Sequence, residues 1–436
     1  MARLPLEGIR VLDFTLIWAG PYAVMLLSDL GAEIIRVESC QHHITNTRGF
    51  SAKPSKEIIG GLGALGRLYA DGDPADDPWN RHALFNSLGR NRYGMTVDLT
   101  REEGREIVHE LVKVSDVIID NNSVGLLDRQ GLDYATVHAL NPTLIYVPMP
   151  VYGLSGPYRD YIGFGANAEG VSGVSSMRGY LDSDPTTQGG TYHMDATSGI
   201  GAAYATLVAL YERERTGKGQ LVEFPQMEHM IHQIGGPMMD AAMNGRARTA
   251  IGNRDPVRAP QGIYRCKGDD KWIAISVGAD EEWAGLCKAM RQPRLAKAPE
   301  YEGNMARQNR HDELDSLISA WTADKDTREL AVLLQKQGVP AGHVANDEDV
   351  YNDPHLEERG FFRWMDHPSC GRHRYPGFPF SYAGTPLRFD SAAPCLGQHN
   401  DLVYRQILGL PGSEIARLTE LGHIGDAYTE EAISTG

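Results

Sequence analysis

The first 150 residues alternate strand patterns with helix patterns, and this alternation restricts the chain to an α/β fold. Residues 9–15 form an apolar strand pattern, residues 19–30 form a helix pattern with Pro21 in its first turn, and residues 32–38 form a second strand pattern. Proline is favoured in the first turn of a helix. A strand, a helix and a second strand in this order predict a βαβ unit with parallel strands.

The same alternation continues along the chain. Three further strand patterns follow, at residues 93–99, 116–120 and 144–148. Between them lie a helix pattern at residues 102–114 and a helical turn at residues 126–129. Five strands interleaved with helices predict a doubly wound parallel sheet. The loops after its strands, at residues 15–21, 38–40 and 120–125, share one edge of the sheet, where such folds bind ligands.

The rest of the chain predicts a second, smaller domain of α+β type. A strand pattern at residues 220–224 is followed by a methionine-rich helix pattern and then by short strands and helices. We expect a large domain formed by residues 1–225 and 341–436, and a small domain formed by residues 226–340. With 436 residues, 42% of them hydrophobic, the chain is long enough for both cores.

Charge and cysteine content narrow the class of protein. A formal net charge of −15 argues against nucleic acid or an acidic membrane as the main partner, because such binding needs clustered cations. Five cysteines without a CxxC pair favour a reducing compartment and predict no structural zinc. The sequence shows no signal peptide and no apolar run that would span a bilayer, so we expect a cytoplasmic protein.

Two short motifs are not interpreted as binding sites. A GxGxxG match at residues 61–66 lies in a segment rich in Gly, Pro, Asp and Asn without a βαβ context, so we interpret it as a flexible loop. His229 and His232 are three apart on a predicted helix, but no acidic or thiol partner is evident. We therefore predict no metal site.

Asp195 starts a long pattern of small and apolar residues that ends before the glycines at 217 and 219, so we place it at the start of a helix. Its carboxylate has two interpretations. It can act as an N-cap that accepts hydrogen bonds from the free N–H groups of the first turn. It can also act as a nucleophile toward an activated acyl group, with nearby N–H groups stabilising the oxyanion. The glycines at 190 and 199 leave room for a substrate but fit both interpretations.

Several motifs, in order along the chain, resemble the class III CoA-transferases, a family that includes formyl-CoA:oxalate and carnitine CoA-transferases and the related α-methylacyl-CoA racemases. The motifs are LEGIRVLDFT (6–15), AGP (19–21), LGAEIIRVE (30–38), NR (91–92) before DL (98–99), DV to N (116–121), LDR (127–129) with Gly131, NP (141–142), SGPYR (155–159) and RTGKGQ (215–220). The resemblance covers nearly the whole chain. It implies a Rossmann-like CoA-binding domain and a homodimer of two interlocked subunits.

The resemblance also implies the site residues. Asp195 takes the position of the catalytic aspartate, and Met194 stands before it where the family usually has glycine. Residues after three strands would contact CoA: Trp18, Ala19, Asp98, Leu99, Thr100, Asn121, Asn122 and Arg129. Relatives often carry a basic residue just after the Glu38 position, where this chain has Ser39, and we expect Arg36 or Arg92 to compensate.

We therefore expect a CoA-transferase that moves CoA from an acyl-CoA donor to a carboxylic acid acceptor through an aspartyl anhydride and an aspartyl-CoA thioester. CoA and acyl-CoA would be substrates, and we expect no tightly bound cofactor. Two alternatives stay open: an α-methylacyl-CoA racemase or epimerase, and a non-catalytic CoA-binding protein. Phe164 and Gly165 occupy the positions where racemases have a general-base histidine followed by aspartate, which disfavours the racemase. His193 is near Asp195 in sequence but displaced from that position.

Overall fold

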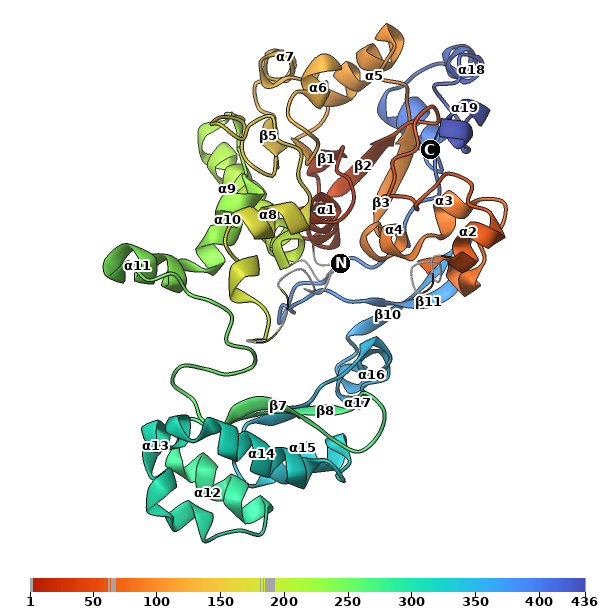
Figure 1. Ribbon diagram of the computed structural model, residues 1–436. Helices are drawn as coiled ribbons and strands as arrows, with labels where there is room; N and C mark the ends of the chain where they lie inside the picture. The colour runs from red at the N-terminus through yellow and green to blue at the C-terminus, as the bar shows by residue number, and fades with distance from the viewer. Residues whose placement is uncertain are drawn as a thin grey trace. The chain divides into compact units, whose positions relative to one another are not determined.

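The computed structural model describes residues 3–61, 63, 68–180, 182, 184 and 193–435. The chain divides into two compact units, the first formed by residues 1–174, 190–239 and 360–436 and the second by residues 175–189 and 240–359. The first unit contains a six-stranded, all-parallel sheet with the strand order β3-β2-β1-β4-β5-β6 (Figure 1). Its strands are β1 (Arg10–Asp13), β2 (Glu33–Glu38), β3 (Arg92–Thr96), β4 (Val117–Asp120), β5 (Ile145–Pro148) and β6 (Gln220–Leu221). The predicted doubly wound parallel sheet is confirmed.

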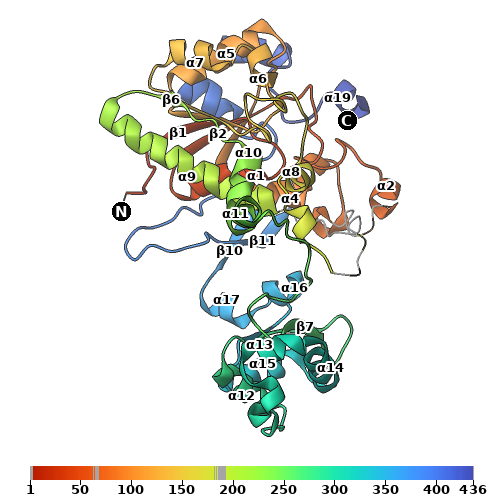
Figure 2. The same ribbon diagram turned by 60° about the vertical axis from the view of Figure 1, so that its left-hand side comes forward.

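Apolar side chains on both faces of these strands recruit helices to both faces of the sheet. Val11 of β1 points into one core and Leu12 into the other, as the two-residue period of a strand requires. On one face lie α1 (Ala19–Asp29) and α9 (His193–Thr216), as Figure 2 shows. On the other lie α5 (Glu102–Lys113), α6 (Leu126–Arg129) and α7 (Tyr134–Leu140). The strand order reverses direction between β1 and β4, which makes the loops after these two strands the expected ligand crevice.

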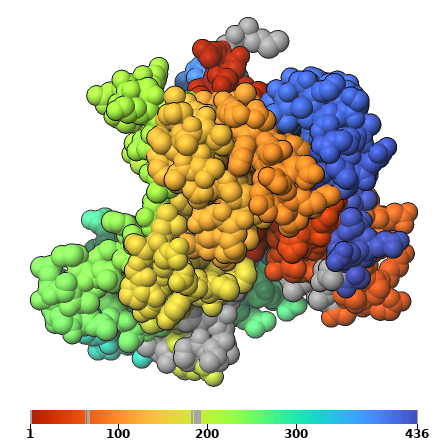
Figure 3. Space-filling model, turned by 90° about the horizontal axis from the view of Figure 1, so that it is seen from above, coloured from red at the N-terminus to blue at the C-terminus, as the bar shows by residue number. Residues whose placement is uncertain are grey.

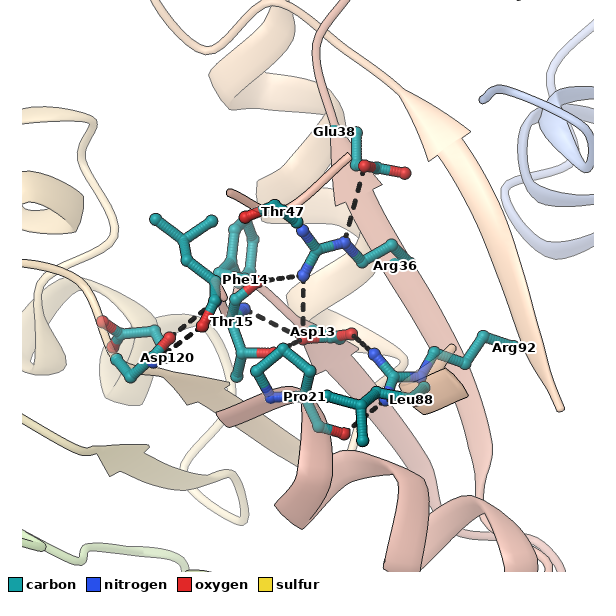
Figure 4. Close-up of polar contacts among 12 residues, drawn as sticks. Asp13, Phe14, Thr15, Pro21, Arg36, Glu38, Thr47, Leu88, Arg92 and Asp120 are labelled. Carbon is teal, nitrogen blue, oxygen red and sulfur yellow. Dashed lines mark hydrogen bonds and ion pairs between the residues drawn. The ribbon is translucent and has the colours of Figure 1, made fainter. Parts of the chain in front are cut away.

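A buried ion-pair network joins the carboxyl end of β1 to a residue within β2 and to the first residue of β3 (Figure 4). Asp13 is fully buried between two guanidiniums, with its carboxylate oxygens 3.3 Å from Nη1 of Arg36 and 2.7 Å from Nη1 of Arg92. Burial alone would raise the pKa of Asp13, but these two cations hold it below its ordinary value. The side chains of Arg36 and Arg92 are therefore buried and paired with Asp13 inside the protein. The expectation that one of them offers a free cation to CoA is wrong.

The described residues of the segment between β2 and β3 are partly folded. These residues form the short α-helices α2 (Lys56–Gly61), α3 (Pro78–Arg81) and α4 (Ala83–Leu88) and a 3-10 helix. Buried Arg48 anchors this segment, because its guanidinium makes two hydrogen bonds of 2.7 Å with the Glu38 carboxylate at the end of β2. The GxGxxG match lies largely outside the described residues.

Three buried histidines of the first unit should make folding sensitive to acid. Burial lowers the pKa of His43, His82 and His367 to about 4, from an ordinary value of 6.5. The unfolded chain therefore binds protons below about pH 6.5, whereas the folded chain does so only near pH 4, and folding loses about 3 kcal/mol per ring across this window. We expect the midpoint of urea unfolding to fall steeply from pH 6.5 to pH 4. In a His82→Gln variant the unfolding midpoint should fall less steeply over this pH range. In His355→Gln, which replaces an exposed ring, it should fall as in wild type. Equal slopes in wild type and both variants would contradict this account.

The C-terminal part of the first unit packs on the α5 face of the sheet. The Tyr404 hydroxyl, in the π-helix η7 (Leu402–Ile407), donates a 2.7 Å hydrogen bond to the carbonyl of Thr96, and Leu418 of α18 (Gly412–Glu420) joins the core under α5. Figure 3 shows this segment (blue) beside the surface of α5 (orange). The remaining elements of this unit are α8 (Gly165–Val171), α10 (Gln226–Gln233), α19 (Glu430–Thr435), the 3-10 helix η2 (Ala70–Gly72), and the antiparallel strands β10 (Phe362–His367) and β11 (Gly371–Pro376).

The second unit is built on a three-stranded antiparallel sheet, β7 (Gln261–Arg265), β8 (Trp272–Ser276) and β9 (Ala341–His343). Its helices are α12 (Asp280–Ala289), α13 (Gly303–Asn309), α14 (His311–Thr322), α15 (Thr327–Lys336), α16 (Asp347–Tyr351) and α17 (Pro354–Glu358), with 3-10 helices η3 (Ser175–Met177), η5 (Leu295–Lys297) and η6 (Pro299–Tyr301). Because β9 pairs with β8, this unit continues past residue 340, the boundary expected from the sequence. Its main segment begins at residue 240, within α11 (Gly235–Asn244), whereas the sequence predicted a start at residue 226.

Candidate active site

Asp195 lies in the first turn of α9, which begins at His193 in the described chain. It is the third residue of this helix and not its N-cap. Its carboxylate accepts no hydrogen bond and forms no ion pair with any described residue. The capping interpretation of Asp195 is therefore wrong, and the carboxylate is left available for chemistry.

Met194, the residue before Asp195, attaches the start of α9 to the rest of the protein by its side chain and by its backbone. The Met194 side chain is buried in a small apolar cluster with Ala168 of α8, Val174 and Met230 of α10. It therefore points into the protein, and the large side chain that replaces the family's usual glycine is packed away from solvent. The Met194 N–H donates a 3.0 Å hydrogen bond to Oε1 of Glu169, a buried residue of α8.

The environment of Asp195 favours a reactive carboxylate. Burial raises the pKa of Asp195 to about 6, and the negative charge of Glu169 acts in the same direction. A carboxylate with this pKa is still ionised at neutral pH but is more basic, and hence more nucleophilic, than an ordinary aspartate. Perturbed acids of this kind are typical of active sites.

Helix α9 comes very close to the start of α1, directly after the β1 loop. A Cβ atom on Gly199 would lie 2.9 Å from the Ala19 carbonyl oxygen and 2.8 Å from the Tyr22 ring, so only glycine allows this approach. Gly199 is one helical turn beyond Asp195 and on the same side of α9. The fold thus packs the helix that carries the proposed nucleophile directly against Ala19, one of the predicted CoA contacts.

The loops after β1 and β4 are tied together at the point where the strand order reverses. Oδ1 of Asn121 accepts the Leu16 N–H at 2.6 Å, and its Nδ2 donates to the Leu16 carbonyl at 2.9 Å. Nδ2 of Asn122 donates to the Phe14 carbonyl at 3.0 Å. Ile17 has a φ of 65°, a strained conformation for a β-branched residue, and the Thr47 hydroxyl accepts its N–H at 3.2 Å. The loop before Trp18 is therefore held in one shape by its neighbours.

We predict that Asn121→Ala destabilises the first unit and weakens CoA binding. The substitution leaves two backbone groups of Leu16 without partners, which costs about 1–3 kcal/mol and frees the β1 loop. Asn141→Ala is the matched control, because Nδ2 of Asn141 also ties two backbone carbonyls, at the opposite edge of the sheet. Urea unfolding and CoA calorimetry should show lower stability in both variants but lower affinity only in Asn121→Ala. Unchanged affinity in Asn121→Ala would contradict the placement of CoA at this loop.

The other predicted contacts lie further along the same edge. Asp98, Leu99 and Thr100 follow β3, the outermost strand, and the Asp98 carboxylate is occupied by Thr100 and by Nε of Arg101 at 2.7 Å. Arg129 ends α6, is exposed, and its guanidinium has no hydrogen-bond or ion-pair partner in the described chain. Arg129 is thus a cation available to an anionic ligand. The Asp98 carboxylate, in contrast, already accepts hydrogen bonds from Thr100 and Arg101 within its own turn.

Sequence reasoning missed Glu169 and Ile17. No pattern marks an acid on α8 as a partner of α9, because the two helices are separated by more than twenty residues and meet only in the folded chain. The His229 ring packs on Phe224, with ring centroids 5.2 Å apart, and against α9 at Gly201. Among the described residues, no three His, Cys, Asp or Glu side chains gather as metal ligands do, and no helix is both long and apolar enough to cross a membrane.

Comparison with known proteins decides the family. The model of CoA-transferase family III matches residues 6–400. The chain belongs to this family. The succinyl-CoA–D-citramalate CoA-transferase of Chloroflexus aurantiacus is 33% identical over 420 residues, 95% of this chain and 96% of the relative. The formyl-CoA:oxalate CoA-transferase of a Bradyrhizobium species is 27% identical, over 98% and 99% of the two chains.

The solved structures agree with this assignment to CoA-transferase family III. A CAIB/BAIF family protein from Brucella suis has a TM-score of 0.78 and 28% identity, over 93% of this chain and all of that one. The resemblance drawn from the sequence motifs is confirmed, and the protein is a CoA-transferase of class III. The roles of individual site residues and the choice of substrates stay proposals.

Proposed function

We propose that the protein transfers CoA between two carboxylic acids with Asp195 as the covalent nucleophile. The observation that carries this proposal is the Asp195 carboxylate, which lies in the first turn of α9 without a partner among the described residues, near the start of α1 and with a raised pKa. Ionised carboxylates attack activated acyl groups when they are positioned and incompletely solvated.

The reaction would proceed in four balanced steps. An Asp195 oxygen attacks the thioester carbon of the donor, the C–S bond breaks, and an acyl-aspartyl anhydride and CoA thiolate form. The thiolate attacks the aspartyl carbonyl and releases the donor acid, which leaves an aspartyl-CoA thioester. The acceptor carboxylate attacks this thioester to form a second anhydride and CoA thiolate. The thiolate then attacks the acceptor's acyl carbon, and the Asp195 carboxylate is restored.

The first turn of α9 would also assist these steps. Each step passes through a tetrahedral oxyanion, and the N–H groups at a helix N-terminus carry partial positive charge toward such an anion. The guanidinium of Arg129, which has no partner in the part of the chain that the structure describes, is the cation that we assign to a phosphate of CoA.

We propose succinyl-CoA as donor and a short hydroxydicarboxylate as acceptor, on the basis of the named activity of the Chloroflexus relative. A panel of succinyl-, formyl- and acetyl-CoA against D-citramalate, L-malate and oxalate, read by mass spectrometry, tests this proposal. Transfer from succinyl-CoA to citramalate or malate should exceed transfer to oxalate at least tenfold. Transfer only from formyl-CoA to oxalate would contradict the substrate class. CoA binding without any transfer would favour a binding protein.

A second assay, of deuterium uptake from solvent, separates transferase from racemase. Racemisation needs a proton donor and a proton acceptor on opposite faces of the α-carbon. Phe164, the N-cap of α8, cannot exchange a proton, and Gly165 has no side chain. A 2-methylacyl-CoA should therefore gain no deuterium from solvent, and rapid deuterium uptake would overturn the transferase proposal.

We also propose a homodimer. An exposed stripe on α9 supports it, formed at helical spacing by Ile200, Tyr204, Val208 and Tyr211, which are 50%, 69%, 48% and 65% exposed. Light scattering should give twice the chain mass, and Tyr204→Glu with Tyr211→Glu should shift the protein toward monomer. A monomeric wild-type protein would contradict the proposal. The cytoplasmic location and the lack of a tightly bound cofactor stay predictions from the sequence.

A further inference from the structure

We propose that Glu169 is a positioning residue for Asp195, which holds the first turn of α9 by its backbone and thereby keeps the Asp195 carboxylate unbound and nucleophilic. This inference rests on the proposed role of Asp195 as the nucleophile. Glu169 lies on α8, 25 residues before Met194, and is 2% exposed.

The geometry of the hydrogen bond gives Glu169 this role. The N–H groups of a first helical turn have no partner within the helix and attract a nearby carboxylate. In α9 the acceptor comes from another helix, because Oε1 of Glu169 accepts the Met194 N–H at 3.0 Å. Asp195, the next residue, is thus relieved of the capping role that its sequence position suggests.

Packing fixes the two acids relative to each other. Ala168, directly before Glu169, and Met194, directly before Asp195, are both buried in the cluster that also contains Met230. A shift of α8 along α9 would break this cluster. The Glu169 carboxylate is therefore held close to the first turn of α9 by apolar contacts as well as by its hydrogen bond.

The charge of Glu169 adds to the effect of its position. Burial is the larger cause of the raised pKa of Asp195, and the negative charge of Glu169 is the second. Among the described residues, the other titratable groups near this turn include His193 in the turn itself, His229 and His232 on α10, and Tyr22 on α1. Burial lowers the pKa of His229 and raises that of Tyr22, which keeps both neutral near pH 7. Glu169 is thus the charge that makes Asp195 more basic.

Glu169→Gln separates this role from simple support of the fold. The amide oxygen can still accept the Met194 N–H, but the charge is lost. We expect the acid limb of the kcat/KM profile to move to lower pH by roughly half a unit to one unit, with a several-fold fall on the plateau because a less basic carboxylate is a weaker nucleophile. The melting temperature should stay close to that of wild type. An acid limb at the wild-type pH, with the plateau unchanged, would overturn the proposal.

Two further variants keep the test decisive. Asp133→Asn removes a charge from the N-cap of α7, on the opposite face of the sheet, and should leave the acid limb in place. If Glu169→Gln fails to fold, Glu169→Asp serves instead, because it keeps the charge but shortens the reach to Met194. In this variant kcat should fall while the acid limb of the pH profile stays in place. An acid limb that moves to lower pH would overturn the proposal. Transfer activity retained in Asp195→Ala would reject the proposed function itself. If Asp195→Ala is inactive but the acid limb of Glu169→Gln lies at the wild-type pH, only the role of Glu169 is rejected.

Discussion

Asp195→Ala should abolish CoA transfer, with a loss of at least about 10³-fold in kcat, while the protein stays folded. The substitution removes the only carboxylate that we assign to covalent chemistry. Its effect on stability should be opposite to that of removing an N-cap, because the Asp195 carboxylate bonds to no described N–H group. A carboxyl whose folded pKa is raised destabilises the folded state once the pH exceeds its unfolded value, 3.8. At pH 7 the free energy of unfolding of the variant should therefore equal or exceed that of wild type.

Glu212→Ala is the matched control for this variant. Glu212 lies on the same helix α9, in its last two turns, and its carboxylate forms a partly exposed ion pair with Arg215 at 3.2 Å. This control should keep full activity. Wild-type turnover in Asp195→Ala would reject the covalent mechanism, and a large loss of stability would mean that Asp195 supports the helix after all.

Asp13→Ala should produce a large loss of stability in the first unit. It leaves the guanidiniums of Arg36 and Arg92 in the interior without their shared carboxylate (Figure 4). Breaking a buried ion pair by removing one partner costs about 3–5 kcal/mol, since the remaining charge stays desolvated. This is a large share of the stability of an ordinary domain. Urea unfolding at pH 7 should show the loss directly.

Glu414→Gln provides the comparison for Asp13→Ala. It breaks an ion pair of 2.7 Å with Arg417 on the surface of α18, where solvent screens the charges. Its unfolding midpoint should match that of wild type. If Asp13→Ala were as stable as Glu414→Gln, the network would not hold β1, β2 and β3 together.

The sequence predicted the sheet well because strand and helix periods are local signals. Every strand from β1 to β5 lies within or next to a predicted strand, and the helical turn at 126–129 is α6. The wrong expectations concern charged residues. Arg36 or Arg92 is expected from the sequence to compensate for Ser39 at the ligand, yet both arginines are buried and form ion pairs with Asp13 on the neighbouring strand β1.

The candidate site was predictable only in part. The position of Asp195 followed from the motif that ends α9, but its freedom from capping depends on Glu169, which packing of α8 on α9 brings to Met194. Local sequence carries no sign of such a contact between helices. The same holds for Met194, whose burial among Ala168, Val174 and Met230 is a property of the fold.

Trapping the intermediate on Asp195 tests the central claim most directly. Wild-type protein would be mixed with succinyl-CoA without an acceptor, quenched with hydroxylamine and digested, and the peptide that contains Asp195 analysed by tandem mass spectrometry. Hydroxylamine attacks an anhydride or thioester carbonyl, so the account predicts a hydroxamate on Asp195 that is absent without succinyl-CoA. Efficient CoA transfer with an unmodified Asp195 peptide, or with the hydroxamate on another residue, would contradict it.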